Sequence, residues 1–465
     1  MTEAASTLPP PSYWRDPLAS RGRRLTTFFL LYVCEGLPLG FTASAIATHM
    51  RRDGLDPDAI GAFVGSLYLP WALKWLYGPI VDTITSVRFG RRRTWIVGAQ
   101  IGMMVTLLAA LPVDFTRSLA LFTAIIFVHN VCSATQDVGI DALAVQVLPA
   151  KERGAANGFM FAGQAIGQAI GGSGVLLISA FVPFKSTYWL VVVALGVILV
   201  FVSWRIREEA EPRAHVVASS ERWRKIAAEI GDFATAAWRA FTGTRAAFIG
   251  VFFAALPLGA YALSLSLQSN LAVELGMDDA AIGTLGFWSA LTSALGCVAG
   301  GWLSDKLGRR KMLALFVVLT AIPTVWLAVR MQAIGHVFPL DADARAAQDP
   351  VLLALFWRVC IVYSFVQGLT YGSSTAMFMD ITTPAVAATQ FTAYMALGNL
   401  ATTYTAVWQG RAVMQLGYPA TLGLDALFGV ACAALLPWLG VRTKATEERA
   451  TGRGERLAAK AAPTR

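Results

Sequence analysis

The chain alternates between long apolar segments and shorter polar ones. A helix that crosses a bilayer needs about 20 mostly apolar residues, and twelve segments of the chain approach or exceed that length. They lie near residues 25–48, 60–81, 94–112, 117–141, 155–181, 187–204, 246–268, 282–303, 312–331, 351–380, 388–412 and 419–440. The pattern therefore predicts an all-α membrane protein with twelve transmembrane helices.

The charges of the connecting segments predict the orientation of these helices. Lys and Arg gather in segments 82–93, 205–245 and 304–311, which lie on one side of the membrane if there are twelve helices. On the opposite side the charged residues are mostly acidic, with few cations besides Arg51 and Arg52; the acidic residues are Glu274, Asp278, Asp279, Asp341, Asp343 and Asp349. Because cytoplasmic loops carry the excess of Lys and Arg, we predict that both termini are cytoplasmic.

The longest internal polar segment divides the helices six and six. It contains an amphipathic stretch around Trp223–Trp238, which indicates a linker lying along the cytoplasmic membrane surface. The basic start of the chain resembles a signal peptide, but the apolar run after it is long enough to span, so we predict an uncleaved first helix. The predicted organisation is an N-terminal tail, a six-helix bundle, a linker, a second six-helix bundle and a basic tail, at residues 1–24, 25–204, 205–245, 246–440 and 441–465.

The two halves repeat a short pattern. Asp58-Ala59-Ile60-Gly61 in the first half corresponds to Ala280-Ala281-Ile282-Gly283 in the second. Each is followed by an Asp and then by a Gly-Arg-Arg, at Asp82 and Gly90–Arg92 and at Asp305 and Gly308–Arg310. Such a repeat predicts two pseudo-symmetric bundles in parallel, with a solute site between them near the middle of the membrane.

Composition supports the membrane class and excludes several functions. Of the 465 residues, 56% are hydrophobic and only 14% are charged, with a mean hydropathy of +0.56, whereas a soluble domain has about 25% charged residues. The net charge of +9 is explained more simply by cytoplasmic loops than by a nucleic-acid partner. The five cysteines lie in apolar stretches without CxxC spacing, so we expect neither a disulfide framework nor a metal site. The chain also lacks a GxxxxGK[ST] loop and a clustered nucleophile, so we expect no cofactor, no direct use of ATP and no enzyme activity.

One segment carries a family signature. Gly301-Trp302-Leu303-Ser304-Asp305-Lys306-Leu307-Gly308-Arg309-Arg310-Lys311 resembles the motif that follows helices 2 and 8 in the major facilitator superfamily. The first half narrows the resemblance through segments 35–40, 73–82, 89–95, 133–141 and 148–154. Together they resemble the branch that contains AmpG-type muropeptide permeases, acetyl-CoA transporters and siderophore-uptake permeases. Ser-Ala-Thr-Gln-Asp-x-x-x-Asp, at 133–141, is the most specific part.

The resemblance implies a proton-coupled secondary transporter in the bacterial inner membrane. Such a protein moves a sizeable polar solute by alternating access, and we expect it to act as a monomer. AmpG-like import of cell-wall muropeptides is the first expectation. Siderophore uptake is the alternative, with acetyl-CoA transport and drug efflux behind it. From a different class, a membrane sensor or a membrane-embedded enzyme stays open.

Ionisable and polar residues inside apolar segments are the candidates for proton coupling or substrate binding, because charges within a bilayer are costly and mark functional sites. Glu35 lies near the centre of the first helix, where a carboxylate could carry a proton or simply be satisfied by a neighbouring helix. One face of the fourth predicted helix carries four polar residues spaced by four, since residues four apart lie above one another: His129, Ser133, Asp137 and Asp141. The full candidate set is Glu35, Lys74, His129, Gln136, Asp137, Gln164, Gln168, Arg358, Gln367 and Tyr371. For Lys74 and Arg358, the alternative is a side chain that only reaches the membrane surface.

A second group is expected to close the cytoplasmic side. When the halves are aligned, Asp141 corresponds to Asp380, whereas Asp137 corresponds to Ala376. A carboxylate present in both halves favours pairing with the basic loops, whereas Asp137 has no counterpart. The candidate cytoplasmic gate comprises Asp82, Arg91, Arg92, Asp141, Arg153, Asp305, Arg309, Arg310 and Asp380. The sequence predicts no role for Asp425.

Overall fold

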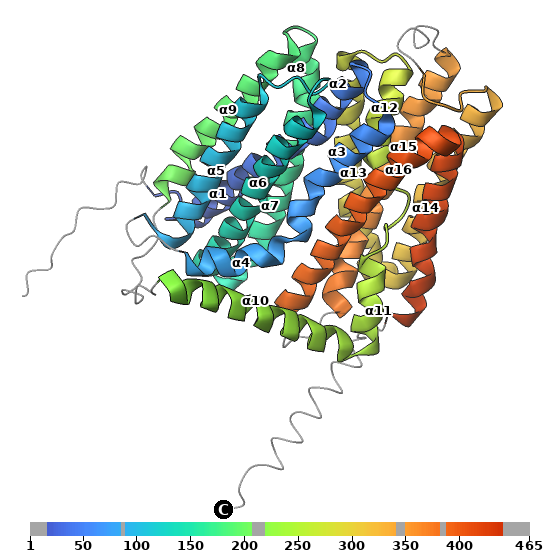
Figure 1. Cartoon of the computed structure of the whole chain (residues 1–465). Helices are drawn as coiled ribbons and strands as arrows, with labels where there is room; N and C mark the ends of the chain where they lie inside the picture. The colour runs from blue at the N-terminus through green and yellow to red at the C-terminus, as the bar shows by residue number, and fades with distance from the viewer. Residues whose placement is uncertain (1–15, 85–88, 207–218, 341–348, 382–386, 440–465) are drawn as a thin grey trace, which may run out of the picture.

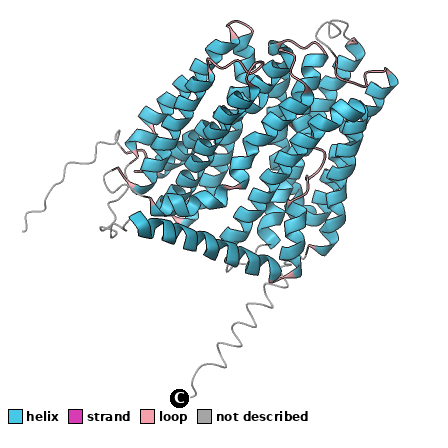
Figure 2. Ribbon diagram, in the orientation of Figure 1, coloured by secondary structure: helices cyan, strands magenta, loops and turns pink. Residues whose placement is uncertain are grey.

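The computed structural model describes residues 16–84, 89–206, 219–340, 349–381 and 387–439. Every regular element in these ranges is helical (Figure 2). The first half contains α1 (Arg21–Gly40), α2 (Ala47–Arg52), α3 (Pro57–Ala72), α4 (Lys74–Thr83), α5 (Arg91–Ala110), α6 (Leu119–Val147), α7 (Ala150–Ala169), α8 (Val175–Ser179) and α9 (Phe184–Phe201). After α10 (Ser219–Thr242), the second half contains α11 (Arg245–Ala254), α12 (Ser266–Glu274), α13 (Asp279–Leu307), α14 (Arg309–Ala333), α15 (Pro350–Ile381) and α16 (Ala387–Ala431).

Two helical bundles stand side by side, with the first half in blue and green and the second in yellow to red (Figure 1). Helix α10 runs beneath both bundles and contacts α4, α11 and α16, where the sequence predicted an amphipathic linker. We call this end of the bundles the inner end. The opposite end, with α2, α8 and α12, is the outer end.

Among the described residues, nine helices are long and apolar enough to cross a membrane, or ten if one bent pair is counted as a single span. That pair is α3 and α4, which meet at an angle of 44°. Helix α16 is interrupted at Gly417, whose φ of 81° is not helical. Short π-helical turns join α1 to α2, at Phe41–Ile46, and α7 to α8, at Ile170–Gly174.

The prediction of one continuous helix over residues 246–268 was wrong. Helix α11 ends at Ala254, and α12 begins only at Ser266. Pro257, which has no backbone N–H, and Gly259, whose φ is 93°, both lie in the connection. An apolar sequence of spanning length therefore holds a break near its middle.

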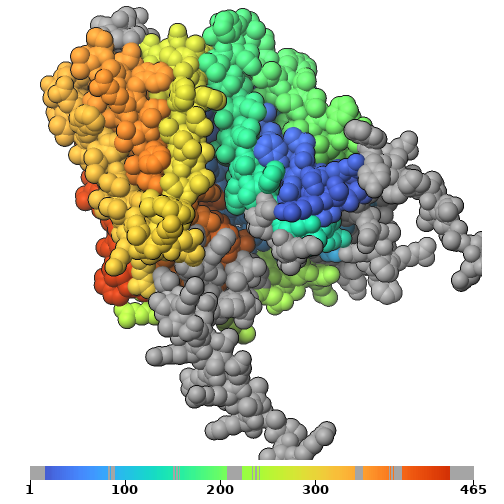
Figure 3. Space-filling model, turned by 180° about the vertical axis from the view of Figure 1, so that it is seen from behind, coloured from blue at the N-terminus to red at the C-terminus, as the bar shows by residue number. Residues whose placement is uncertain are grey.

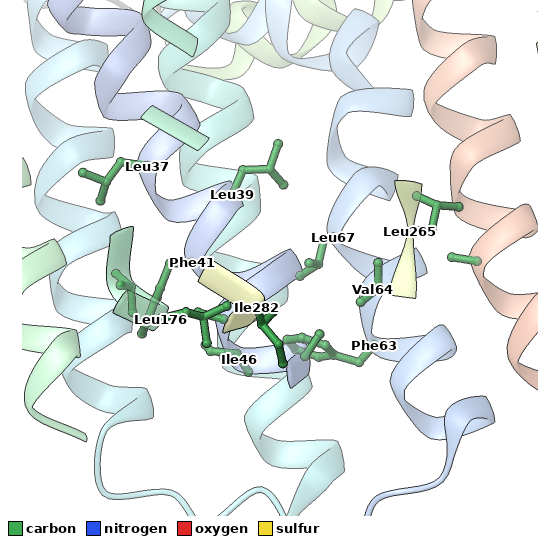
Figure 4. Close-up of a cluster of buried hydrophobic side chains, with 14 of the residues drawn as sticks. Leu37, Leu39, Phe41, Ile46, Phe63, Val64, Leu67, Leu176, Leu265 and Ile282 are labelled. Carbon is green, nitrogen blue, oxygen red and sulfur yellow. The ribbon is translucent and has the colours of Figure 1, made fainter. Parts of the chain in front are cut away.

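The apolar core joins the bundles at their outer end. One continuous cluster contains Leu39, Ile46 and Phe63 of the first half and Leu265 and Ile282 of the second (Figure 4). Seen from behind, α13 in yellow packs against α7 and α8 in teal (Figure 3). A separate cluster, made from α11, α14, α15 and α16, lies within the second half. The two halves thus share a core at the outer end.

Candidate functional site

Glu35 is held inside the first bundle, and its side chain is only partly satisfied. It lies on α1 three residues before Pro38, and 2% of its surface is exposed. Its Oε1 accepts hydrogen bonds from Gln164 Nε2 at 2.9 Å and from Trp71 Nε1 at 3.3 Å. Its Oε2 is buried without a hydrogen-bond partner among the described residues. A buried carboxylate oxygen without a donor is costly, whereas a protonated carboxyl could donate from the same position.

Lys74 lies between two carboxylates. Its Nζ is 2.5 Å from Asp137 Oδ2 and 2.8 Å from Asp141 Oδ2. Lys74 opens α4, immediately after the break at Leu73, and both aspartates come from α6. The Tyr32 hydroxyl, on α1, donates to Asp141 Oδ1 at 2.7 Å. Five helices, α1, α3, α4, α6 and α7, therefore supply one polar cluster that we call the carboxylate cluster: Tyr32, Glu35, Trp71, Lys74, Asp137, Asp141 and Gln164.

The charges of the carboxylate cluster do not balance when every group is ionised. Glu35, Asp137 and Asp141 carry three negative charges against the single positive charge of Lys74. Like charges held close together disfavour full ionisation, and burial adds to the cost. Uptake of a proton would reduce the excess negative charge.

The other predicted coupling residues lie elsewhere. His129 is buried between α6 and α5, where Nδ1 lies 3.0 Å from both Met103 O and Thr106 Oγ1. Gln136 donates to Leu31 O at 3.3 Å and so faces α1. Arg358 is exposed on α15. Gln168 and Tyr371 are also exposed, whereas Gln367 has a buried Oε1 without a hydrogen-bond partner among the described residues.

The predicted gate residues are only partly described. Asp305, near the end of α13, pairs with Arg309, the first residue of α14, at 2.8 Å across the turn at Gly308. Arg310 donates to Pro437 O at 3.5 Å. Arg91 and Arg92 open α5. The side chains of Asp82, Arg153 and Asp380 lie outside the described part of the chain. Asp141, placed in the gate by the alignment of the halves, lies beside Lys74 within the first bundle.

A charged contact between the halves at the outer end was not predicted. Arg51 Nη2 lies 2.6 Å from Glu274 Oε1, and the two side chains are 3% and 0% exposed. Tyr418 donates to the same carboxylate oxygen, and the backbone N–H of Leu340 donates to the other oxygen at 3.2 Å. His336 Nε2 approaches Glu274 Oε2 at 3.6 Å. The acidic residues on this side of the membrane were visible in the sequence, but not their pairing.

A second ionic contact lies beside the first. Asp279, at the start of α13, forms an ion pair with Arg52, whose Nε lies 2.8 Å from Oδ1. His49 Nε2 lies 3.1 Å from the other carboxylate oxygen, Oδ2. Ser179, at the end of α8, donates to Asp279 at 2.7 Å. The imidazole of His49 stacks on Phe184, with ring centroids 3.6 Å apart. We call the residues Arg51, Glu274, His49, Arg52 and Asp279 the outer charge contact.

Glycines bring the backbones of the two halves together near this contact. A Cβ on Gly61 would lie 2.5 Å from Ala406 O, and one on Gly410 would lie 2.4 Å from Pro57 O, so α3 and α16 touch through their main chains. On the other side, a Cβ on Gly283 would lie 2.8 Å from Ser173 O. Small residues allow such close approach between helices in membranes. The outer end is therefore closed by packing as well as by charge.

Asp425, for which the sequence predicted no role, satisfies the break between α11 and α12. Its Oδ2 accepts hydrogen bonds from the backbone N–H groups of Tyr261 and Ala262 at 2.8 and 2.9 Å. Gln409 donates to its Oδ1 at 2.6 Å. Irregular backbone is tolerated at membrane depth only where protein groups satisfy it, and Asp425 supplies that satisfaction.

Comparison with known proteins places these features in a family. A family model described as Major Facilitator Superfamily matches residues 28–266 and 247–464. The chain is 27% identical to the anhydromuropeptide permease of Escherichia coli K12 over 418 residues, which cover 88% of this chain and 77% of that one. It is 23% identical to putative transporter AmpG 4 of Rickettsia felis, covering 76% of this chain and 87% of that one.

Solved structures share the fold at low sequence identity. A point mutant of the nucleoside transporter NupG aligns with a TM-score of 0.65 and 13% identity over 90% of this chain and all of that chain. The inward open conformation of the xylose transporter XylE from E. coli aligns with a TM-score of 0.63 and 13% identity, covering 91% of this chain and 97% of that chain.

Proposed function

The chain belongs to the Major Facilitator Superfamily, and from this membership we propose that it is a proton-coupled importer of a sizeable polar solute of the muropeptide class. The family and the permease relatives indicate a transporter. The apolar helices and the bacterial relatives indicate a multi-pass protein of the bacterial inner membrane.

The proposed topology has twelve passages in two bundles of six. The interruption of α16 at Gly417 supports counting that helix as two passages. Helices α11 and α12, joined through the segment that Asp425 holds, would form one broken passage. Both termini are then cytoplasmic, as the distribution of Lys and Arg favours, and the inner end faces the cytoplasm.

The buried Glu35 Oε2 that lacks a hydrogen-bond partner among the described residues carries the coupling proposal. A proton on Glu35 would lower the excess negative charge of the carboxylate cluster and make this oxygen a donor. Asp137, which shares Lys74 with Asp141, is the second proton or substrate group. Moving one charge across the membrane potential supplies about 2.3 kcal/mol per 100 mV, which is enough to drive uptake.

The outer charge contact supports an inward-facing state in this conformation. With the outer end closed, access to the carboxylate cluster would come from the cytoplasm. Alternating access then requires the outer contacts to separate while the inner ends approach each other. The basic inner loops, with Asp305, Arg309 and Arg310, remain our proposed parts of the gate that forms there.

The substrate class rests on the relatives. Two of them are named as an anhydromuropeptide permease and an AmpG-type transporter, and the first-half motifs resemble the same branch. Siderophore uptake, acetyl-CoA transport and drug efflux remain predictions of the sequence, and siderophore uptake enters the test below as the competing outcome.

Uptake of radiolabelled anhydromuropeptide into membrane vesicles tests the proposal. We expect uptake driven by an imposed proton gradient and abolished by an uncoupler. Glu35→Gln should abolish gradient-driven uptake while labelled-for-unlabelled exchange persists, since exchange needs no net proton movement. Asp114→Asn, in an exposed outer loop, is the matched control and should transport normally.

Two results would reject different parts of the proposal. Uptake that continues at the same rate after the proton gradient is collapsed rejects the coupling. A vesicle preparation that transports a ferric siderophore but no anhydromuropeptide rejects the substrate class while leaving the coupling intact. Absence of any transport, together with a product formed from the solute, would favour a membrane-embedded enzyme.

A further inference from the structure

A groove on the surface of the first bundle has no part in the proposed transport mechanism. Its larger lobe, of about 430 Å³, lies between α5 and α6 and is lined by Trp95, Gly98, Ala99, Val131, Cys132 and Thr135, among others. Its smaller lobe, of about 210 Å³, lies between α5 and the end of the first half, against Phe89, Arg93 and Trp204. Thr94 and Gly98 line both lobes, so we call the whole the two-lobed groove.

The groove is open at Gly98. A Cβ built on this glycine would meet no heavy atom within 4 Å, whereas one built on Gly102, a single turn further on, would lie 2.8 Å from Cys132 Sγ. Cys132 therefore fills the space beside Gly102, whereas the space beside Gly98 is open. The space at Gly98 is lined chiefly by apolar side chains and suits a hydrocarbon chain.

The groove faces the bilayer. Along the same surface of α5 and α6, the next side chains are apolar and exposed: Ile101 is 45% exposed, Val105 58% and Val128 51%. In a chain that spans a membrane, such a stripe contacts lipid tails. The acyl chains of the surrounding lipids therefore have direct access to the groove from the bilayer.

The mouth of the groove is basic. Arg93 stacks over Trp204 with its guanidinium 5.3 Å from the ring, and it donates to Trp204 O at 2.5 Å. Arg91 and Arg92 precede it at the start of α5. Gly98 lies five residues beyond Arg93, or roughly 7.5 Å along a helix. An anionic head group at Arg93 would thus place its acyl chains at Gly98.

We propose that the two-lobed groove is a binding site for an anionic glycerophospholipid of the inner leaflet, such as phosphatidylglycerol. Its phosphate lies near Arg93 and Trp204, and its two chains enter the two lobes on either side of Gly98. Basic pockets between transmembrane helices on the cytoplasmic side are suited to anionic head groups, and Trp side chains favour the same depth. The site is separate from the carboxylate cluster and does not depend on the transport proposal.

Native mass spectrometry of the whole purified protein in detergent tests the site, with phosphatidylglycerol or phosphatidylcholine added at equal concentration. The wild-type protein should retain phosphatidylglycerol about 10-fold better than phosphatidylcholine, because Lys and Arg at the membrane surface attract anionic head groups. Gly98→Trp, which fills the open space, should lower phosphatidylglycerol retention by a similar factor. Ile101→Trp, on the same helix face but outside the groove, should retain it as the wild type does. Arg93→Gln should remove the preference for the anionic lipid.

The outcomes separate the parts of the proposal. Equal retention by Gly98→Trp and the wild type overturns the site, and equal retention of both lipids by the wild type overturns the anionic head group. Inorganic phosphate at millimolar concentration should not displace the lipid. Displacement would show that the site binds a free anion at Arg93 without needing the acyl chains, and would reject the lipid site.

Cys132 gives a second measurement in the wild-type chain, which avoids the folding risk of a new Trp. Phosphatidylglycerol should slow the alkylation of Cys132, which lines the larger lobe, but not that of Cys297, which lies on α13 in the other half. Peptide mass spectrometry resolves the two thiols. An alkylation rate at Cys132 that does not change with lipid contradicts the proposal.

Discussion

Replacing Arg51 with Leu should release the outer end of the bundles. The guanidinium makes two hydrogen bonds with Glu274 Oε1, at 3.0 and 2.6 Å, and both side chains are almost fully buried. Removing one partner of a buried ion pair costs about 3–5 kcal/mol, because the other charge stays behind uncompensated. We expect the lower end of this range, since the Tyr418 hydroxyl still donates to Glu274.

A cost of about 3 kcal/mol applies only to the closed state, because Glu274 can be hydrated when the outer end opens. Every 1.4 kcal/mol changes an equilibrium constant about tenfold. Arg51→Leu should therefore shift the balance between closed and open outer ends roughly 100-fold toward the open state. A population that is minor in the wild type would become easily measurable.

Spin labels report this shift directly. Labels at Arg117, in the outer loop of the first half, and at Gln332, at the outer end of α14, lie on exposed positions of opposite bundles. Pulsed electron paramagnetic resonance should show a single distance for the otherwise wild-type chain and an added longer one for Arg51→Leu. Arg330→Leu, which removes an exposed charge at the same end, should leave the distances unchanged. In the double variant Arg51→Leu, Glu274→Leu, the longer population should shrink, since no unpaired charge remains.

The distance measurement can refute the reasoning in two ways. A folded Arg51→Leu protein with the wild-type distance distribution would show that the ion pair does not hold the outer end closed. A double variant that opens as far as the single variant would show that lost packing, rather than the stranded carboxylate of Glu274, causes the opening.

Three further substitutions test other contacts. Asp425→Ala leaves two backbone N–H groups and Gln409 without their acceptor, and at about 1–3 kcal/mol for each buried unsatisfied group we expect clear loss of thermal stability; an unchanged melting temperature would contradict the assigned role. Gly171→Val should prevent folding of the first bundle, because a Cβ at Gly171 would lie 1.9 Å from a backbone oxygen of α1. Gly423→Val is the control, because a Cβ there would meet no atom within 4 Å, and it should elute as a single folded species in size-exclusion chromatography. Lys74→Met should abolish uptake and lower protein yield, and adding Asp137→Asn should restore the yield but not the uptake; a single variant that transports normally would exclude Lys74 from the mechanism.

Much of the architecture follows from one-dimensional patterns. Long apolar segments predicted the bundles, and the amphipathic spacing around Trp223 predicted α10, because both signals are local. The break between α11 and α12 is less visible, since Pro257 and Gly259 stand in a segment that is apolar throughout. Its stabilising group, Asp425, lies far along the chain, 163 residues beyond Ala262, and no local pattern connects the two.

The candidate site shows the same division. The spacing of Asp137 and Asp141 placed both on one face of α6, and the structure agrees. Their shared partner Lys74 depends on the bend after Leu73, which turns α4 away from α3 by 44°. The sequence does not show this angle, so it left open the alternative that the Lys74 side chain only reaches the membrane surface. Pairing across helices is a property of the three-dimensional packing, so the sequence could name these groups but not join them.

The repeated sequence acquires a physical meaning at the outer end. Gly61 and Gly283 occupy corresponding positions of the two halves, and each touches a backbone oxygen of the opposite half, Ala406 O and Ser173 O. Glycine contacts of this kind are weak and not directional, so they allow one bundle to rotate against the other at both contacts. The hydrogen-bonded ion pairs of the outer charge contact are directional, and they favour a single arrangement of the two bundles. In the proposed transport cycle, the glycines would permit the rocking motion, whereas the ion pair of Arg51 with Glu274 would set which end is closed. A change of charge in the carboxylate cluster would then be the event that shifts this balance.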